Sequence, residues 1–86
     1  MSRFIVEIDI MPLQGLLDPQ GRTVAHALRK LGFEGVASVR VGKHIQMIIE
    51  SESETEAKHQ VEDSLAKLLY NPVVEQYRYV IRHIDP

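Results

Sequence analysis

The first strand of the chain is marked by alternating hydrophobic and polar residues. From Arg3 to Met11, large apolar side chains stand at every even position, and a more polar set stands between them. This period of two is typical of a strand with one buried face. Pro12 has no amide hydrogen to donate to a neighbouring strand, so we expect the strand to end there.

A helix is predicted to begin at Asp18, whose carboxylate suits the N-cap because it can accept from the free amides of the first turn. Pro19 suits the first helical position, where its missing amide hydrogen costs nothing. Gly32 suits a left-handed C-cap, after which Phe33 can fold back onto Leu28. Apolar residues recur at helical spacing between these ends: Val24, Leu28 and Leu31.

The segment from Val36 to Glu50 is rich in β-forming residues and is too long for one ordinary strand. Gly42-Lys43 fits the centre of a two-residue hairpin turn, which would split the segment into two paired strands. The alternative is one long strand with a bulge at Gly42. We expect the hairpin.

A second helix and a last strand complete the pattern. Ser53 begins a capping box with Glu56, and Asn71-Pro72 ends the helix. The apolar stripe of this helix consists of Ala57, Val61, Leu65, Leu68 and Leu69. The last strand lies between Val73 and Ile84, where apolar and polar residues alternate again.

The predicted order is therefore β-α-β-β-α-β. With 86 residues, 44% hydrophobic and 26% charged, the chain has the size and composition of one globular domain, residues 1–86. We expect an α+β, ferredoxin-like fold: an antiparallel four-stranded sheet with two helices on one face.

The composition argues against several classes of function. There is no cysteine, so no disulfide, thiolate nucleophile or cysteine-based metal site is available. A net charge of -2 gives no general attraction to nucleic acid or anionic lipid. No apolar run is long enough to span a bilayer, and no signal-like start is present. We expect a cytoplasmic chain that binds neither nucleic acid nor membrane.

Candidate chemistry is equally sparse. The four histidines do not have metal-binding spacing, no serine lies in a nucleophile elbow, and no glycine pattern matches a phosphate-binding loop. The acidic run from Glu50 to Glu56 is simply a strand end followed by a helix start. We therefore expect no catalytic residue and no metal, and a role as a non-catalytic module.

The sheet face away from the helices is predicted to be unusually apolar. It carries four aliphatic residues among charges, whose burial would be worth roughly 6–12 kcal/mol gross: Ile5, Ile48, Val80 and Ile84. Acidic Glu7 and Asp9 would lie at its centre. Basic residues would flank them: Arg40, Arg78 and Arg82. We predict self-association through this face; a twisted sheet with scattered surface aliphatics is the alternative.

Three segments carry a family resemblance: Leu17-Asp18-Pro19-Gln20-Gly21, Val39-Arg40-Val41-Gly42-Lys43 and Asn71-Pro72-Val73-Val74-Glu75-Gln76-Tyr77. In this order and spacing they resemble the PurS family, the small subunits of phosphoribosylformylglycinamidine synthase. Together with the length, the resemblance covers essentially the whole chain. The first two segments are the specific ones, whereas the amino-terminal strand and the carboxyl-terminal tail agree only in hydrophobic pattern.

The resemblance implies a place in de novo purine biosynthesis. The enzyme converts formylglycinamide ribonucleotide and glutamine into formylglycinamidine ribonucleotide and glutamate in an ATP-dependent amidation. A glutaminase subunit releases ammonia, and a large synthetase subunit uses ATP and Mg. The PurS-like subunit joins the two and assists ammonia transfer; it binds no cofactor itself. Family members form dimers that can pair into tetramers.

The same resemblance suggests which residues contact the partner subunits: Asp18, Pro19, Gln20, Gly21, Arg40, Gly42 and Lys43. Helix initiation already accounts for Asp18 and Pro19, and a turn would account for Gly42. Gln20 and Lys43 have the weakest structural explanation and are the stronger candidates. The competing function is a ferredoxin-like regulatory domain that binds a small ligand between paired sheets.

Overall fold

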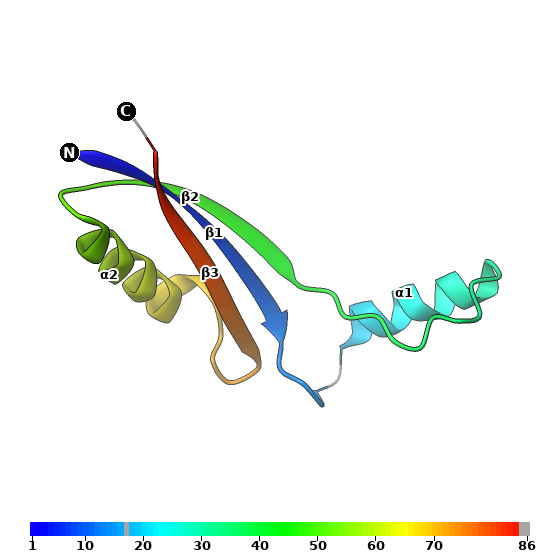
Figure 1. Ribbon diagram of the computed structural model, residues 1–86. Coiled ribbons are helices and arrows are strands. Elements are labelled where there is room, and N and C mark those ends of the chain that lie inside the picture. Colours follow the sequence, from blue (N-terminus) through cyan, green and yellow to red (C-terminus); the bar gives the residue numbers. More distant parts are fainter. Residues whose placement is uncertain (17, 85–86) are drawn as a thin grey trace.

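The computed structural model describes residues 1–16 and 18–84, and it contains three strands in one antiparallel sheet of order β2-β1-β3 (Figure 1). The elements are β1 (Ser2–Pro12), α1 (Pro19–Lys30), β2 (Lys43–Ser51), α2 (Glu54–Ser64), the π-helical turn η1 (Leu65–Leu69) and β3 (Glu75–Ile84). None of the helices in these residues is long and apolar enough to cross a membrane.

The core lies between the central strand β1 and the helix α2. The even-numbered apolar residues of β1 are buried, as the alternation predicts, and they meet the apolar stripe of α2. Ser53 caps α2 by accepting a hydrogen bond from the amide of Glu56 at 3.1 Å, which confirms the predicted start. The core residues are Phe4, Val6, Ile8, Ile10, Ile49, Ala57, Val61 and Leu65.

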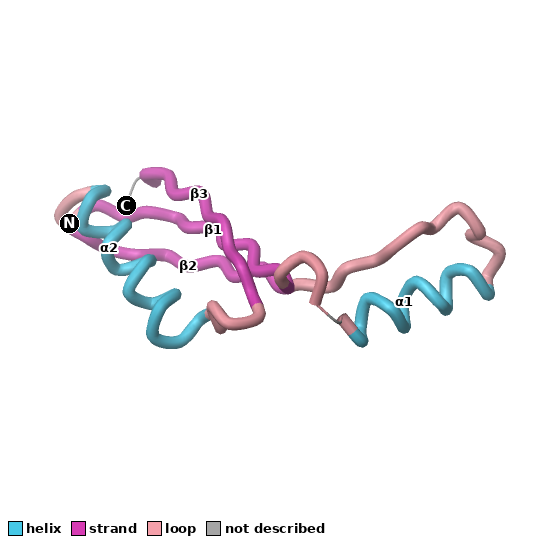
Figure 2. Tube along the Cα trace, turned by 90° about the horizontal axis from the view of Figure 1, so that it is seen from below, coloured by secondary structure: helices cyan, strands magenta, loops and turns pink. Residues whose placement is uncertain are grey.

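Helix α1 does not lie on the sheet. It projects beyond one end of the strands, and the chain returns beside it to enter β2 (Figures 1 and 2). The Arg29 guanidinium ties this return leg to the helix by donating to the carbonyls of Val36 and Ala37, both at 3.0 Å. We call residues 19–42 the arm. The radius of gyration is 16.9 Å, against about 12 Å for a compact chain of this length.

The predicted four-stranded sheet with two helices on one face is therefore wrong in strand number and in the position of α1. The hairpin at Gly42-Lys43 is also wrong, because the chain runs on through Gly42 into β2. A Gly-X hairpin turn needs a positive φ at its glycine, and among the described residues only Gly15 and Gly32 have one. Residues 36–42 form no ladder, and three of their backbone groups bond along the arm instead: the carbonyls of Val36 and Ala37 accept from Arg29, and the amide of Val41 donates to Asp18.

The ends of α1 agree with the prediction. Asp18 is the N-cap, and Gly32 takes φ +103 directly after the helix. The amide of Phe33 donates to the carbonyl of Leu28 at 3.0 Å, which closes a Schellman motif. The arm nevertheless exposes its apolar side chains at the tip, with Leu31 75% and Phe33 57% exposed.

The π-helical turn η1 separates two leucines that the sequence pattern had placed on one stripe. Leu65 is 1% exposed in the core, whereas Leu68 is 83% exposed. A π-helix has a wider turn than an α-helix, so the later residues rotate relative to the earlier stripe. Leu68 points away from the core for this reason.

Leu65→Ala should lower the free energy of unfolding by about 2–5 kcal/mol, because a fully buried leucine loses its packing and leaves a cavity. Leu68→Ala, three residues away in the same turn, should change it by less than about 0.5 kcal/mol. Urea unfolding of both variants at one protein concentration measures the difference. Equal losses would contradict this assignment of the core.

Candidate functional site

Asp18 connects the two legs of the arm where they leave the sheet. Its Oδ1 accepts a hydrogen bond from the amide of Gly21 at 3.0 Å, and its Oδ2 accepts one from the amide of Val41 at 2.9 Å. The Gly21 amide, helped by that of Val41, holds the pKa of the Asp18 carboxyl below its ordinary value. One side chain thus caps α1 and fixes the return leg against it.

Two glycines permit the close passage of the return leg. A Cβ on Gly21 would collide with the carbonyl oxygen of Val39, and a Cβ on Gly42 would collide with the carbonyl oxygen of Ile10 and the sulfur of Met11. The first contact presses the return leg onto α1, and the second presses it onto the end of β1. Both positions need glycine for space, because neither has a positive φ.

Further bonds fix the same region, which we call the arm root: Pro12, Leu13, Asp18, Gly21 and residues 39–42. The Arg40 guanidinium donates to the carbonyl of Pro12, which joins the return leg to the end of β1. The amide of Leu13 donates to the carbonyl of Val74 at 2.9 Å, which joins the root to the turn before β3. The direction of the arm is therefore set by hydrogen bonds from three parts of the chain.

The predicted partner-contact residues all lie at or beside the arm root, and several have internal roles. Asp18, Gly21, Arg40 and Gly42 build the root itself. The exposed ones are Gly42 and three residues outside the root, Pro19, Gln20 and Lys43. Contact with a partner stays a prediction for the whole set; Leu17 of the same sequence segment lies outside the described residues.

The four aliphatic residues predicted for self-association share the sheet face opposite α2, which we call the open face. Ile5 of β1 is paired with Ile48, Glu7 is paired with Val80, and Ile84 is paired with Arg3. Ile48 is 53% and Val80 66% exposed. Arg78 and Arg82 lie on this face too, each opposite an odd-numbered residue of β1. Arg40 does not, because it belongs to the arm.

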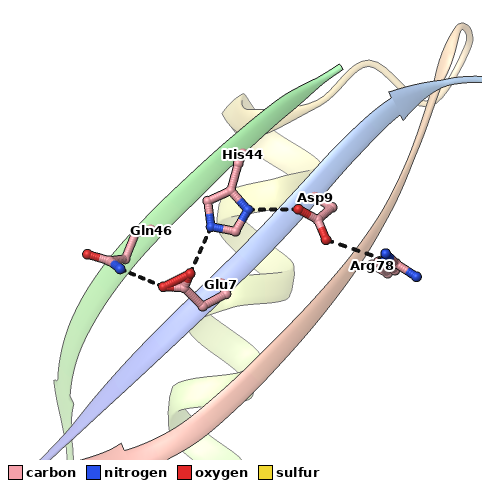
Figure 3. Close-up of polar contacts among 5 residues, drawn as sticks. All are labelled: Glu7, Asp9, His44, Gln46 and Arg78. Carbon is pink, nitrogen blue, oxygen red and sulfur yellow. Dashed lines mark hydrogen bonds and ion pairs between the residues drawn. The ribbon is translucent and has the colours of Figure 1, made fainter. Parts of the chain in front are cut away.

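A chain of polar side chains crosses the open face next to the arm root (Figure 3). His44 Nδ1 lies 2.7 Å from Asp9 Oδ1, and His44 Nε2 lies 2.8 Å from Glu7 Oε2. Gln46 donates to the other oxygen of Glu7 at 2.6 Å, and Arg78 donates to the other oxygen of Asp9 at 3.4 Å. A carboxylate can only accept, so both contacts are hydrogen bonds only when both ring nitrogens carry hydrogen and the imidazole is positively charged.

The pKa values of this chain are displaced accordingly. The hydrogen bond to Asp9, followed by that to Glu7, raises the pKa of His44 above its ordinary value. Hydrogen bonds from Gln46 and then His44 lower the pKa of Glu7, and the bond from His44 is the main cause of the lowered pKa of Asp9.

Sequence reasoning missed the role of His44. Glu7 and His44 are 37 positions apart, so no local spacing links them. Only the register of β1 with β2 places His44 directly opposite Asp9 and diagonal to Glu7, whose own partner is Gln46. The alternation of β1 showed that both carboxylates share a face, but the wrongly predicted hairpin left the pairing partner of that face unidentified.

This surface is open to solvent. Its charged groups stand on an exposed sheet, where water screens them and no enclosed acid–base pair forms. Among the described residues, no three histidine or acidic side chains gather in a way that could hold a metal ion. A hollow at the arm root is lined by Asp9, Met11, Gly42, Lys43, His44, Gln76, Tyr77 and Arg78.

A projecting arm and a sheet face with exposed aliphatic residues are features of a small chain that packs against other chains. Comparison with known proteins gives the family. Residues 5–83 match the model of the PurS family, phosphoribosylformylglycinamidine (FGAM) synthase, and the chain belongs to that family.

Individual relatives agree in sequence and in structure. The chain is 42% identical over 72 residues to the phosphoribosylformylglycinamidine synthase subunit PurS of Methanocaldococcus jannaschii, which covers 84% of this chain and 87% of that protein. The crystal structure of M. jannaschii PurS, one of the subunits of formylglycinamide ribonucleotide amidotransferase in the purine biosynthetic pathway, superposes with a TM-score of 0.83 over 95% of this chain and 99% of that chain, at 36% identity.

A chain from the PurLQS structure of Thermotoga maritima superposes with a TM-score of 0.85, covering 98% of this chain and 100% of that chain at 33% identity. The family resemblance that the three sequence segments predicted is therefore confirmed. With it, the chain is assigned to purine biosynthesis as a PurS subunit of FGAM synthase.

Gly21→Ala should destabilise the protein, although a glycine-to-alanine change inside a helix ordinarily stabilises by about 0.5–1 kcal/mol. The added Cβ forces the return leg away from α1, a strain of about 1–3 kcal/mol. Thermal unfolding and hydrogen exchange of the Val41 amide would both report the loss. Gly35→Ala is the control, since nothing lies within 4 Å of its Cβ position; equal behaviour of the two variants would contradict the close passage.

Proposed function

We propose that this chain is a non-catalytic PurS subunit that bridges the glutaminase and synthetase subunits of the complex and assists ammonia transfer between them. The observation that carries the proposal is the arm, a rigidly rooted projection whose apolar surface has no cover of its own. A chain without an enclosed acid–base pair among its described residues contributes by contact and not by chemistry. Ammonia must pass between active sites without protonation or escape, so close sealing of subunits is the property required.

The arm supports pairing with a second copy of the chain. Helix α1 has 12 residues, a length at which a helix in water is marginal without packing. Its buried residues are Gly21 and Ala25, whereas Val24, Leu31 and Phe33 are exposed. An element of this kind needs a partner surface to stabilise it.

The sheet has room for such an arm on its helix-bearing face. A ferredoxin-like layer places two helices there, and here the chain supplies one, α2. Apolar residues beside the core remain only partly buried, including Ile45, Met47, Tyr79 and Ile81. A two-fold dimer in which each copy lays its α1 on the other would cover both arms at once, because a two-fold interface repeats every contact.

The open face is a second surface for self-association and would turn pairs into tetramers. Its aliphatic residues form a patch that a soluble chain seldom leaves uncovered: Ile5, Ile48, Val80 and Ile84. The salt-bridged chain across the same face limits how closely a second sheet can approach near the arm root. We therefore place the contact toward the other end of the strands, around Ile5 and Ile48.

Leu31→Glu should shift the protein toward monomer, because a charge on the apolar tip of the arm would be desolvated in the dimer. Leu68→Glu is the matched control, since Leu68 is at least as exposed but lies outside the arm. Sedimentation equilibrium at tens of micromolar protein measures both. A monomeric wild type, or a Leu31→Glu variant that associates normally, would contradict pairing through the arm.

Gln20 and Lys43 are the positions that we propose for contact with the other subunits. Both side chains are exposed, one in the first turn of α1 and the other at the first position of β2. Neither side chain makes a hydrogen bond or ion pair within the described residues, so their replacement leaves the arm root intact. ATP and Mg would be used by the synthetase subunit, and the cytoplasmic location stays a prediction.

Gln20→Ala and Lys43→Ala should fold normally but co-purify less with the glutaminase and synthetase subunits when glutamine and ADP are present. Synthesis driven by glutamine should fall more than synthesis driven by added ammonium, because added ammonium bypasses the transfer. Gln60→Ala and Lys67→Ala are matched controls on exposed positions of α2 and η1. Normal glutamine-driven synthesis in both test variants would show that these positions are wrongly assigned.

A further inference from the structure

The Glu7–His44–Asp9 chain lies where the arm joins the sheet. His44 is the second residue of β2. Gly42, which immediately precedes that strand, is pressed against the end of β1. Directly opposite on β1 is Asp9, and one row further along is Glu7. The two hydrogen bonds of His44 therefore fasten the start of β2, where the return leg ends, to the central strand β1.

This fastening depends on one proton. The imidazolium donates from both ring nitrogens, at 2.7 Å to Asp9 and 2.8 Å to Glu7. A neutral ring has one N–H and one bare nitrogen, so one of the two carboxylates would face a lone pair. Two carboxylates at alternate positions of one strand would then also repel each other with no cation between them.

We propose that Glu7, His44 and Asp9 form a protonation-dependent clamp that holds the return leg of the arm on the sheet and so tunes pairing through the arm. The inference rests on the proposed arm-mediated dimer. With the clamp closed, the arm root is already fixed before a second copy binds. Association then loses less conformational entropy. With the clamp open, the start of β2 keeps its backbone pairing with β1 but loses the side-chain bonds that reinforce it where the return leg enters the sheet.

The charged groups around His44 favour its protonated, closed state. From β1 it faces Glu7 and Asp9; from β3, Arg78 bonds Asp9 and Arg82 acts on Glu7. Lys43 is next to His44 on β2, and Tyr77 borders the same hollow, but both pair with Ile10 and so belong to the opposite face of the sheet. The two arginines neutralise part of the carboxylate charge, but the direct contacts of His44 are with acids.

The sign of the pH dependence follows from the raised pKa of His44. Its contribution is fully present below the ordinary imidazole value of 6.5 and is lost as the pH rises through the higher value of the folded protein. The lowered pKa values of Glu7 and Asp9 act at acid pH, well outside this window. Raising the pH should therefore loosen the arm root and weaken pairing.

Two measurements on the full chain test the clamp from about pH 6 to about pH 9, a range that brackets imidazole titration. NMR titration of the His44 ring should give a pKa above that of an exposed histidine, and Asp9→Asn should lower it. Sedimentation should show the dimer dissociation constant rising by about two- to fivefold across the range. That rise should be absent in His44→Gln and present in the control His59→Gln, whose position on α2 is exposed.

The possible outcomes distinguish the clamp from the proposed arm-mediated dimer on which it rests. A His44 that titrates like His59, or a His44→Gln dimer with the pH profile of the wild type, would overturn the clamp while leaving the dimer intact. A wild type that is monomeric at every pH would overturn pairing through the arm, and with it the tuning of assembly. In that case a raised His44 pKa together with weaker protection of the Val41 amide at high pH would still establish the clamp as a lock on the arm root.

Discussion

The structure depends on the position at which the return leg crosses the first turn of α1. There, one carboxylate, that of Asp18, accepts hydrogen bonds from the amides of Gly21 and Val41. The return leg uses the carbonyls of Val36 and Ala37 and the amide of Val41 for bonds along the arm, a choice of partners that competes with pairing as a fourth strand beside β2. The three-stranded sheet, the open outer edge of β2 and the uncovered surface of α1 all follow from that choice.

The two most specific segments of the family resemblance acquire a physical meaning from the same crossing. One contributes Asp18 and Gly21, and the other contributes Arg40 and Gly42. Together they hold two legs of chain closer than side chains at the glycine positions would allow. Their spacing in the sequence is the length of chain needed to travel out along α1 and back. The segments therefore determine first the geometry of the arm. Gln20 lies in the first turn of the arm helix, and Lys43 directly follows the arm.

Elements that depend on neighbouring residues could be predicted, and those that depend on distant ones could not. The alternation of β1, the caps at Asp18 and Ser53 and the left-handed Gly32 are local, and the structure confirms them. Gly42 was misinterpreted because a glycine that makes a turn and a glycine that permits close approach look alike in sequence. Only Ile10 and Met11, more than thirty positions earlier, distinguish the two.

The candidate site likewise has a part that could be predicted from neighbouring residues and a part that could not. Residues of the open face follow from alternation alone, so Ile5 and Val80 were placed correctly. The link from Glu7 through His44 to Asp9 requires the register between strands. That register was hidden as long as β2 was expected to pair with a hairpin partner. Any cover for the exposed apolar residues of the arm would come from another copy or another chain, and the pattern of one sequence does not show which.

The elongated outline has a consequence for hydrodynamics. A radius of gyration of 16.9 Å is what a compact protein of about 210 residues would have, more than twice the length of this chain. A single copy should therefore elute from a sizing column earlier than a globular chain of the same mass, so its elution volume overstates its mass. Methods that measure mass itself, such as light scattering, do not depend on shape and would distinguish an elongated single copy from an assembly.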